Sequence, residues 1–140
     1  MIPLLAALLL PAALADTEEK KIRTVLDDQA AAWNKGDLNG FMSGYWNSPD
    51  LSFYSGKDKK KGWDETFNNY KKRYQADGKE MGTLTFSEEE VQILGPEHAV
   101  VKGRWKVVMK KEILEGLYTL IMRKTDQGWK IVHDHTSVGS

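Results

Sequence analysis

The feature that most constrains the fold of this chain is the order in which segments with helical and strand-like periodicity follow one another. Residues 17–34 and 63–74 place apolar side chains at helical spacing. Four later runs, residues 83–94, 98–109, 112–125 and 128–137, read as strands that are separated by short turn signals. Helices followed by strands that short turns connect are typical of an α+β fold with a mainly antiparallel sheet.

Three helices are predicted in the first half of the chain. Asp16 with Glu19 three residues later resembles a capping box, which predicts that the first helix begins near Thr17 and runs to Asn34. Asp37 is positioned to cap a short second helix. A third helix follows from about residue 62.

Two segments around the third helix carry unusual side chains. Trp63, Phe67, Tyr70 and Tyr74 form one aromatic stripe along the helix. Before it, a short strand is predicted at residues 51–55, and the lysine-rich residues 57–61 are predicted to form a charged loop. That loop is either a solvated surface, which we favour, or a lip that binds anions.

A change of parity in residues 83–94 predicts a bend in the sheet. Leu84 and Phe86 occupy even positions, whereas Val91 and Ile93 occupy odd positions. Such a switch indicates a β-bulge near residues 87–90. A strongly bent sheet wraps around its contents and so favours a cavity.

The first fifteen residues carry no charge and resemble a secretory signal peptide. Ala13-Leu14-Ala15 fits the small-x-small cleavage pattern, although no Lys or Arg precedes the apolar run. The run is too short to span a bilayer comfortably. We therefore expect a signal peptide at residues 1–15, one mature domain at residues 16–140, and a periplasmic or secreted protein. The alternative is an apolar N-terminal helix on a cytoplasmic protein.

The composition excludes several kinds of chemistry. Removing the first 15 of the 140 residues leaves 125, the size of one domain. The absence of cysteine excludes disulfides and thiolate nucleophiles. Twenty acidic and twenty basic residues balance, which gives no indication of a nucleic-acid partner or a membrane surface. We expect no cofactor. Five tryptophans are many for this length, and such residues often line cavities.

Two of the three histidines lie two residues apart in the last strand-like run. Alternation with period two places His133 and His135 on the face of Trp129 and Ile131, which we expect to face the core. They would act there as acid–base or hydrogen-bonding groups, or as struts that anchor the strand. A metal site is disfavoured because a third ligand is missing. Asp134 is expected on the opposite face, in an interface, a turn or a surface salt bridge.

Aromatic side chains are the candidates for a pocket wall that suits an apolar ligand with ring or acyl character. They are Trp33, Tyr45, Trp46, Phe53, Trp63, Tyr70 and Trp105. Ordinary core packing is the alternative for each of them singly. Arg104 is a candidate anion contact if the bend turns it inward, and otherwise a surface or dimer contact. No phosphate-binding loop or serine nucleophile elbow is present.

Several segments resemble a known family. Residues 33–41, Trp-Asn-Lys-Gly-Asp-Leu-Asn-Gly-Phe, are similar to the hallmark of the nuclear transport factor 2-like (NTF2-like) superfamily. Residues 103–105, 116–120 and 128–137 resemble its SnoaL-like branch, and within it the DUF4440 (SgcJ/EcaC-type) group most closely. The resemblance covers about Thr17 to Ser137.

The resemblance implies a cone-shaped, cystatin-like α+β fold, in which three N-terminal helices pack against a curved, mostly antiparallel sheet. It also implies a pocket at the open end and a homodimer through the outer sheet face. Enzymes of the superfamily use a pocket Asp, His or Tyr. Only His133 and His135 can be carried over here, and we find no pocket-facing aspartate of the isomerase type in this sequence.

Three functional hypotheses follow from the resemblance and the residues together. The first is an exported homodimer that binds a small, largely apolar molecule in its cone. The second is an enzyme of the isomerase, lyase or hydrolase type that uses a pocket histidine as general acid or base. The third is a non-catalytic dimerisation or association domain.

Overall fold

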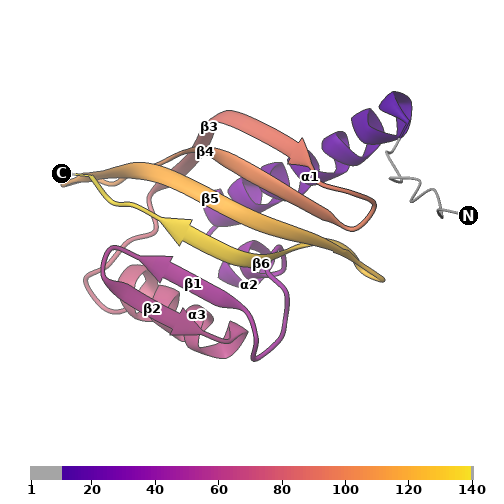
Figure 1. Cartoon of the computed structure of the whole chain (residues 1–140). Helices are drawn as coiled ribbons and strands as arrows, with labels where there is room; N and C mark the ends of the chain where they lie inside the picture. The colour runs from indigo at the N-terminus through magenta and orange to yellow at the C-terminus, as the bar shows by residue number, and fades with distance from the viewer. Residues whose placement is uncertain (1–10, 140) are drawn as a thin grey trace, which may run out of the picture.

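The computed structural model describes residues 11–139 and shows helices packed on one face of a curved sheet (Figure 1). The elements, in chain order, are α1 (Ala12–Asn34), α2 (Leu38–Met42), β1 (Ser52–Ser55), β2 (Asp58–Lys61), α3 (Trp63–Tyr70), a π-helical turn η1 (Lys71–Gln75), β3 (Thr83–Ile93), β4 (His98–Val108), β5 (Ile113–Thr125) and β6 (Gly128–Thr136). The α+β fold predicted from the sequence is confirmed.

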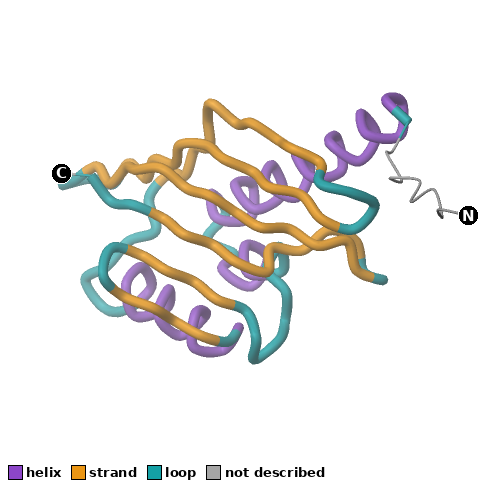
Figure 2. The backbone as a smooth tube through the Cα atoms, in the orientation of Figure 1, coloured by secondary structure: helices purple, strands orange, loops and turns teal. Residues whose placement is uncertain are grey.

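The sheet has six strands in the order β2-β1-β6-β5-β4-β3 (Figure 2). All neighbours are antiparallel except β1 and β6, which run parallel. The four long strands β3 to β6 are consecutive hairpins, as expected from the turn signals between them. The helical layer lies behind this sheet in Figure 1, with α3 behind β1 and β2.

Two irregularities bend the long strands. The bulge predicted in β3 is confirmed, because the register between β3 and β4 shifts between Ser87 and Glu90, and Glu88 has a φ of 55°. A second shift lies in β6, where Ile121 of β5 pairs with His133 and the next residue, Met122, pairs with Ile131. One residue of β6 therefore lies outside the regular pairing, and the side chains after it change faces.

Two predictions about element ends are wrong. Helix α1 begins at Ala12 with Pro11 as its N-cap, so Asp16 lies inside the helix and does not cap it. Residues 57–61 are not only a loop, because β2 (Asp58–Lys61) pairs with β1. The lysines of β2 lie on an edge strand, where charge discourages pairing with another chain. The predicted cap of α2 is confirmed, since Asp37 accepts a hydrogen bond from the backbone of Gly40 at 2.9 Å.

The core lies between the helices and the inner face of the sheet. On β4 this face carries Ala99, Val101, Trp105 and Val107, all buried. A buried carboxylate fastens α1 to the last hairpin, because Glu18 accepts hydrogen bonds from the Trp129 indole at 2.6 Å and from Lys124 at 3.0 Å.

The predicted signal peptide, residues 1–15, falls mainly outside the described residues. Within residues 11–139, no helix is long and apolar enough to cross a membrane.

Candidate functional site

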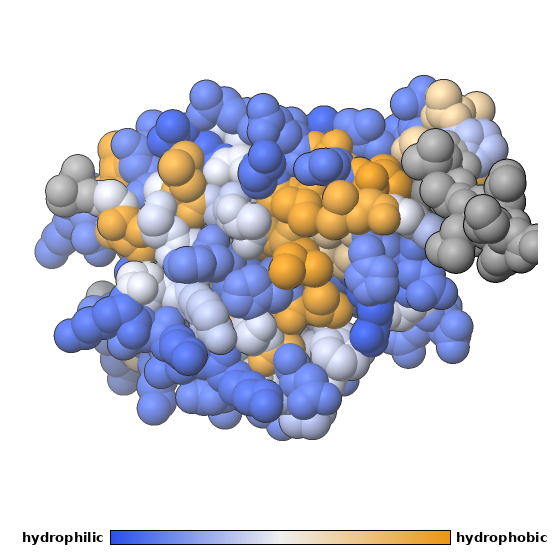
Figure 3. Space-filling view, viewed as in Figure 1, coloured by the Kyte–Doolittle hydropathy of each residue, from blue (hydrophilic) through white to orange (hydrophobic). Residues whose placement is uncertain are grey.

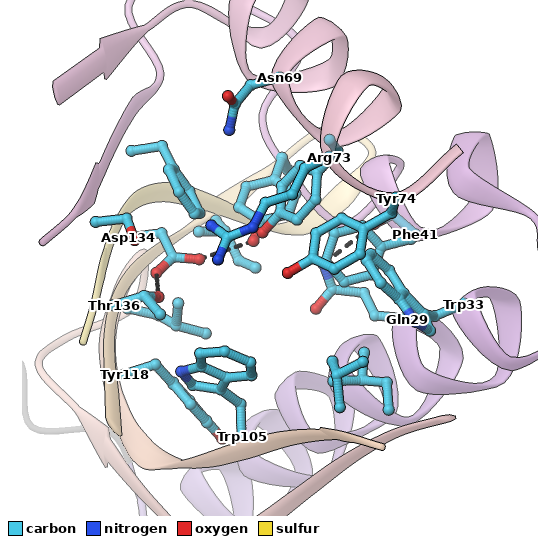
Figure 4. Close-up of a pocket in the computed structure, with 18 of the residues that line it drawn as sticks. Gln29, Trp33, Phe41, Asn69, Arg73, Tyr74, Trp105, Tyr118, Asp134 and Thr136 are labelled. Carbon is cyan, nitrogen blue, oxygen red and sulfur yellow. Dashed lines mark hydrogen bonds between the residues drawn. The ribbon is translucent and has the colours of Figure 1, made fainter. Parts of the chain in front are cut away.

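A cavity of about 140 Å³ lies between the helices and the inner face of the sheet (Figure 4). Buried and exposed residues both line it, so the cavity opens to solvent at one end. Its buried lining includes Leu26, Gln29, Trp33, Phe41, Tyr45, Phe53, Tyr74, Leu84, Trp105, Val107, Tyr118, Leu120, Ile131 and Asp134.

Aromatic rings from the helical side form most of one wall. Trp33 of α1 lies near the centre of this group, with ring centroids 5.0 Å from Phe41 and 4.8 Å from Tyr74. Tyr70 of α3 continues the wall to Phe53 of β1 at 5.6 Å. These pairs are edge-to-face, the arrangement that the charge distribution of aromatic rings favours. Such interlocked rings hold the wall in one shape.

The buried carboxylate in this lining belongs to Asp134. Tyr45 donates its hydroxyl hydrogen bond to Oδ2 at 2.7 Å, and Thr136 donates to Oδ1 at 2.6 Å. Asp134 is only 4% exposed. Figure 4 shows its carboxylate directed toward the cavity together with these two bonds. The site therefore presents one anchored hydrogen-bond acceptor in an aromatic surrounding.

Burial changes the protonation of this group. It raises the pKa of Asp134 to about 6, and the hydrogen bonds from Thr136 and Tyr45 limit the rise. Burial, and then the charge of Asp134, raises the pKa of Tyr45 and of Tyr70 well above the usual value, so both stay neutral. Asp134 is thus mainly ionised at neutral pH yet can take up a proton near pH 6.

The position of Asp134 corrects a sequence expectation. It was expected on the face opposite the core, but the irregularity between Ile131 and His133 exchanges the faces of β6. Ile131 and Asp134 both point inward, whereas His133 and His135 point outward. For the same reason an aspartate lines the cavity, where the sequence had indicated none of the isomerase type.

His133 and His135 do not line the cavity. On the outer face, His133 Nδ1 lies 2.6 Å from the Ser52 hydroxyl oxygen, and the ring of Tyr54 packs against both histidines. Burial, and next the neighbouring His135, lowers the pKa of His133. Within residues 11–139, no three metal-ligating side chains come together.

The other predicted residues divide into two groups. Five of the seven aromatic candidates line the cavity, namely Trp33, Tyr45, Phe53, Tyr70 and Trp105. Trp63 instead stacks on Phe67, and Trp46 lies beneath the guanidinium of Arg123. Arg104 is exposed on the outer face and forms an ion pair with Glu88, so the bend does not turn it inward.

The rim of the cavity is polar. Asp58 and Lys60 of β2 and Arg73 of η1 line it where the cavity opens. The π-helical turn brings both Arg73 and Tyr74 to the cavity, and such turns occur often at functional sites. Neither residue was predicted from the sequence as a site residue, although Tyr74 belonged to the predicted aromatic stripe.

Comparisons with known proteins agree with the fold. A family model described as a SnoaL-like domain matches residues 22–140. An NTF-2 like protein of unknown function from Shewanella oneidensis is 39% identical, with a TM-score of 0.80 over 85% of this chain and 98% of that one. An NTF2-like superfamily protein from Salmonella enterica is 21% identical, with a TM-score of 0.74 over 90% of this chain and 94% of that one. No protein of curated function matches.

Proposed function

This chain belongs to the SnoaL-like domain family, within the NTF2-like fold, and we propose that it binds a small, largely apolar molecule in the cavity around Asp134. The observation that carries the proposal is the combination of an aromatic wall with one buried, anchored carboxylate. Ligand sites are typically concave and apolar with a few fixed polar groups. The fold alone does not assign a ligand, since this architecture serves many functions.

The size of the cavity limits the ligand. An engineered apolar cavity of about 150 Å³ is known to hold benzene. A cavity of about 140 Å³ therefore suits one ring or a short acyl chain rather than a fused-ring compound. Its open end leaves room for a substituent that reaches the rim.

A blocked entrance tests the proposal. Val138 lines the cavity and is 40% exposed, so Val138→Trp should fill the opening while the core stays packed. Leu94→Trp is the matched control, because Leu94 is an exposed apolar residue that does not line the cavity. Isothermal titration with single-ring compounds should show binding to the wild type and to L94W but not to V138W. Equal binding to all three proteins, or to none, would contradict the proposal.

A second function, proton transfer, is favoured by one observation. Asp134 has a pKa of about 6, lies against the cavity, and is held by Tyr45. A general base works best when its pKa lies near the working pH. We therefore transfer the acid–base role that the sequence suggested for His133 and His135 to Asp134.

Deuterium exchange tests this second function. A small cyclic ketone incubated with the protein in D₂O should gain deuterium next to its carbonyl group, and Asp134→Asn should abolish the gain. An unchanged rate in D134N would exclude Asp134 as the base. Retained exchange in His135→Gln is expected, because His135 does not reach the cavity.

The outer face of the sheet supports a homodimer. Val108, Ile113, Leu117 and Ile121 are exposed apolar residues of β4 and β5. Figure 3 shows hydrophobic surface gathered on this face. Leu117→Lys should convert the dimer to a monomer in analytical ultracentrifugation, while Leu94→Lys, at the β3–β4 turn, should not. A monomeric wild type would contradict the homodimer.

Export is the remaining part of the proposal. The uncharged N-terminal segment and Ala13-Leu14-Ala15 support cleavage before Asp16. N-terminal sequencing of the protein recovered from its own cells should begin at Asp16. A protein that starts at Met1 in the cytoplasmic fraction would contradict export.

A further inference from the structure

The carboxylate of Asp134 is buried without a cationic partner. Its two hydrogen-bond donors, Tyr45 and Thr136, are neutral hydroxyls. Within residues 11–139, the carboxylates that form ion pairs are those of Glu18, Glu19, Glu88, Glu89 and Glu90. A buried negative charge that no cation offsets is unfavourable, so a cation that enters the cavity gains by meeting it.

The carboxylate of Asp134 has unoccupied hydrogen-bond acceptor positions. Each of its oxygens receives one of the two hydroxyl hydrogen bonds. An ionised carboxylate offers about four acceptor positions in all, so about two remain for a ligand. Since Asp134 can only accept hydrogen bonds when ionised, the group that meets it has to be a donor. A charged donor forms the strongest bond of this kind.

The surrounding rings suit a cation as well. Phe53, Tyr70 and Trp33 belong to the lining of the same cavity. Aromatic rings attract ammonium groups and accept the apolar part of the same ligand. An amine on a small apolar group therefore matches both components of the lining, whereas a carboxylate would be repelled by the ionised Asp134.

The cationic side chains of the cavity rim do not neutralise the carboxylate of Asp134. The guanidinium of Arg73 packs over the ring of Tyr74 at 5.6 Å and forms no ion pair with Asp134. Figure 4 shows Arg73 extending toward the same cavity from the helical side. Lys60 of β2 is half-buried and lines the same cavity, but it forms no ion pair with Asp134.

We infer that the cavity selects a protonated primary amine carried on a single ring or a short apolar chain, with the ammonium donating to Asp134. The inference rests on the proposed binding function and adds the charge of the ligand to it. Arg73 lines the same cavity without pairing with Asp134, and its positive charge opposes a bound cation rather than assists it.

Three probes of the same shape test the inference at pH 7.5: benzylamine, benzyl alcohol and benzoate. Benzylamine should bind the wild type at least about tenfold more tightly than benzyl alcohol, the difference expected between a charged and a neutral donor. Asp134→Asn should remove this preference without abolishing the binding of benzyl alcohol. Arg73→Gln should strengthen the binding of benzylamine and weaken the binding of benzoate.

A pH series gives an independent readout. Protonation of Asp134 should lower the affinity for benzylamine about tenfold between pH 7.5 and pH 5, whereas the affinity for benzyl alcohol should change little. The other titratable groups that line the site are four tyrosines whose pKa values are all raised, Tyr45, Tyr70, Tyr74 and Tyr118. The remaining charged or titratable groups are the rim residues Arg73, Lys60 and Asp58, and His135 on the outer side of β6. The D134N variant is the control for all these groups, because its affinity for benzylamine should not change with pH.

The outcomes separate this inference from the proposed function. Equal affinity for benzylamine and benzyl alcohol, or tightest binding of benzoate, overturns the amine assignment and leaves the binding cavity intact. Failure of all three probes to bind overturns both.

Discussion

Asp134→Asn provides the sharpest test of the electrostatics of the cavity. Burial holds the pKa of Asp134 at about 6 in the folded protein, whereas the ordinary pKa of an aspartate side chain is 3.8. Because the folded state binds the proton more tightly than the unfolded state, ionisation of Asp134 weakens folding as the pH rises from about 4 to about 6. A difference of about two pKa units corresponds to about 3 kcal/mol, which is lost once the pH exceeds both values.

Asparagine keeps the shape of the side chain and removes the titration. The unfolding free energy of D134N minus that of the wild type should therefore increase by about 2–3 kcal/mol from pH 4 to pH 8. At pH 8 the variant should be the more stable protein, although the exchange of charged for neutral hydrogen bonds offsets about 1 kcal/mol of the gain.

Urea denaturation followed by tryptophan fluorescence at several pH values measures this difference. Subtraction of the two pH curves of the unfolding free energy cancels the contributions of the other titrating groups, including Glu18 and Glu89. Asp126→Asn is the control, because Asp126 is exposed in the β5–β6 turn and should give a flat difference. A flat difference for D134N as well would refute the assignment of Asp134 as a buried, cation-free carboxylate.

Three further predictions concern the framework around the cavity, each measured by urea denaturation. Glu18→Gln should destabilise the protein by about 1–3 kcal/mol at pH 7, since the charged hydrogen bond to the Trp129 indole is lost; an unchanged midpoint would contradict the clamp between α1 and the last hairpin. Tyr118→Phe should stabilise it by about 1 kcal/mol, because the buried Tyr118 hydroxyl has no hydrogen-bond partner within the described residues; a loss of stability would reveal a partner. Gly116→Ala should destabilise it by more than about 2 kcal/mol, because the added methyl group would collide with the Ser137 carbonyl; wild-type stability would show that the C-terminal segment lies elsewhere.

Much of the fold follows from local patterns in the sequence. The parity change between Phe86 and Val91 predicted the bulge in β3, because a strand that buries both apolar pairs has to twist between them. Asp37 capped α2 for the ordinary reason that its carboxylate satisfies a free backbone amide. Tertiary contacts decide what local signals leave open. Residues 58–61 become a strand only because β1 lies beside them.

The candidate site was harder to predict because β6 gives no sign of its irregularity. Trp129, Ile131, His133 and His135 alternate regularly in the sequence, which favours one face for all four. The irregular pairing appears only in the register with β5, and it moves Asp134 to the cavity. A shift of one residue in a strand exchanges every face after it, so a local pattern cannot locate such a residue without its partner strand.

The five tryptophan indole N–H groups report directly on whether the cavity around Asp134 holds a ligand. Trp33 and Trp105 line the cavity, whereas the remaining three do not. In a ¹H–¹⁵N NMR titration with benzylamine or benzyl alcohol, the Trp33 and Trp105 signals should shift saturably, whereas the signals of Trp46, Trp63 and Trp129 should not move. Shifts confined to Trp46, Trp63 or Trp129, or no shifts at millimolar concentrations of either compound, would contradict ligand binding in this cavity.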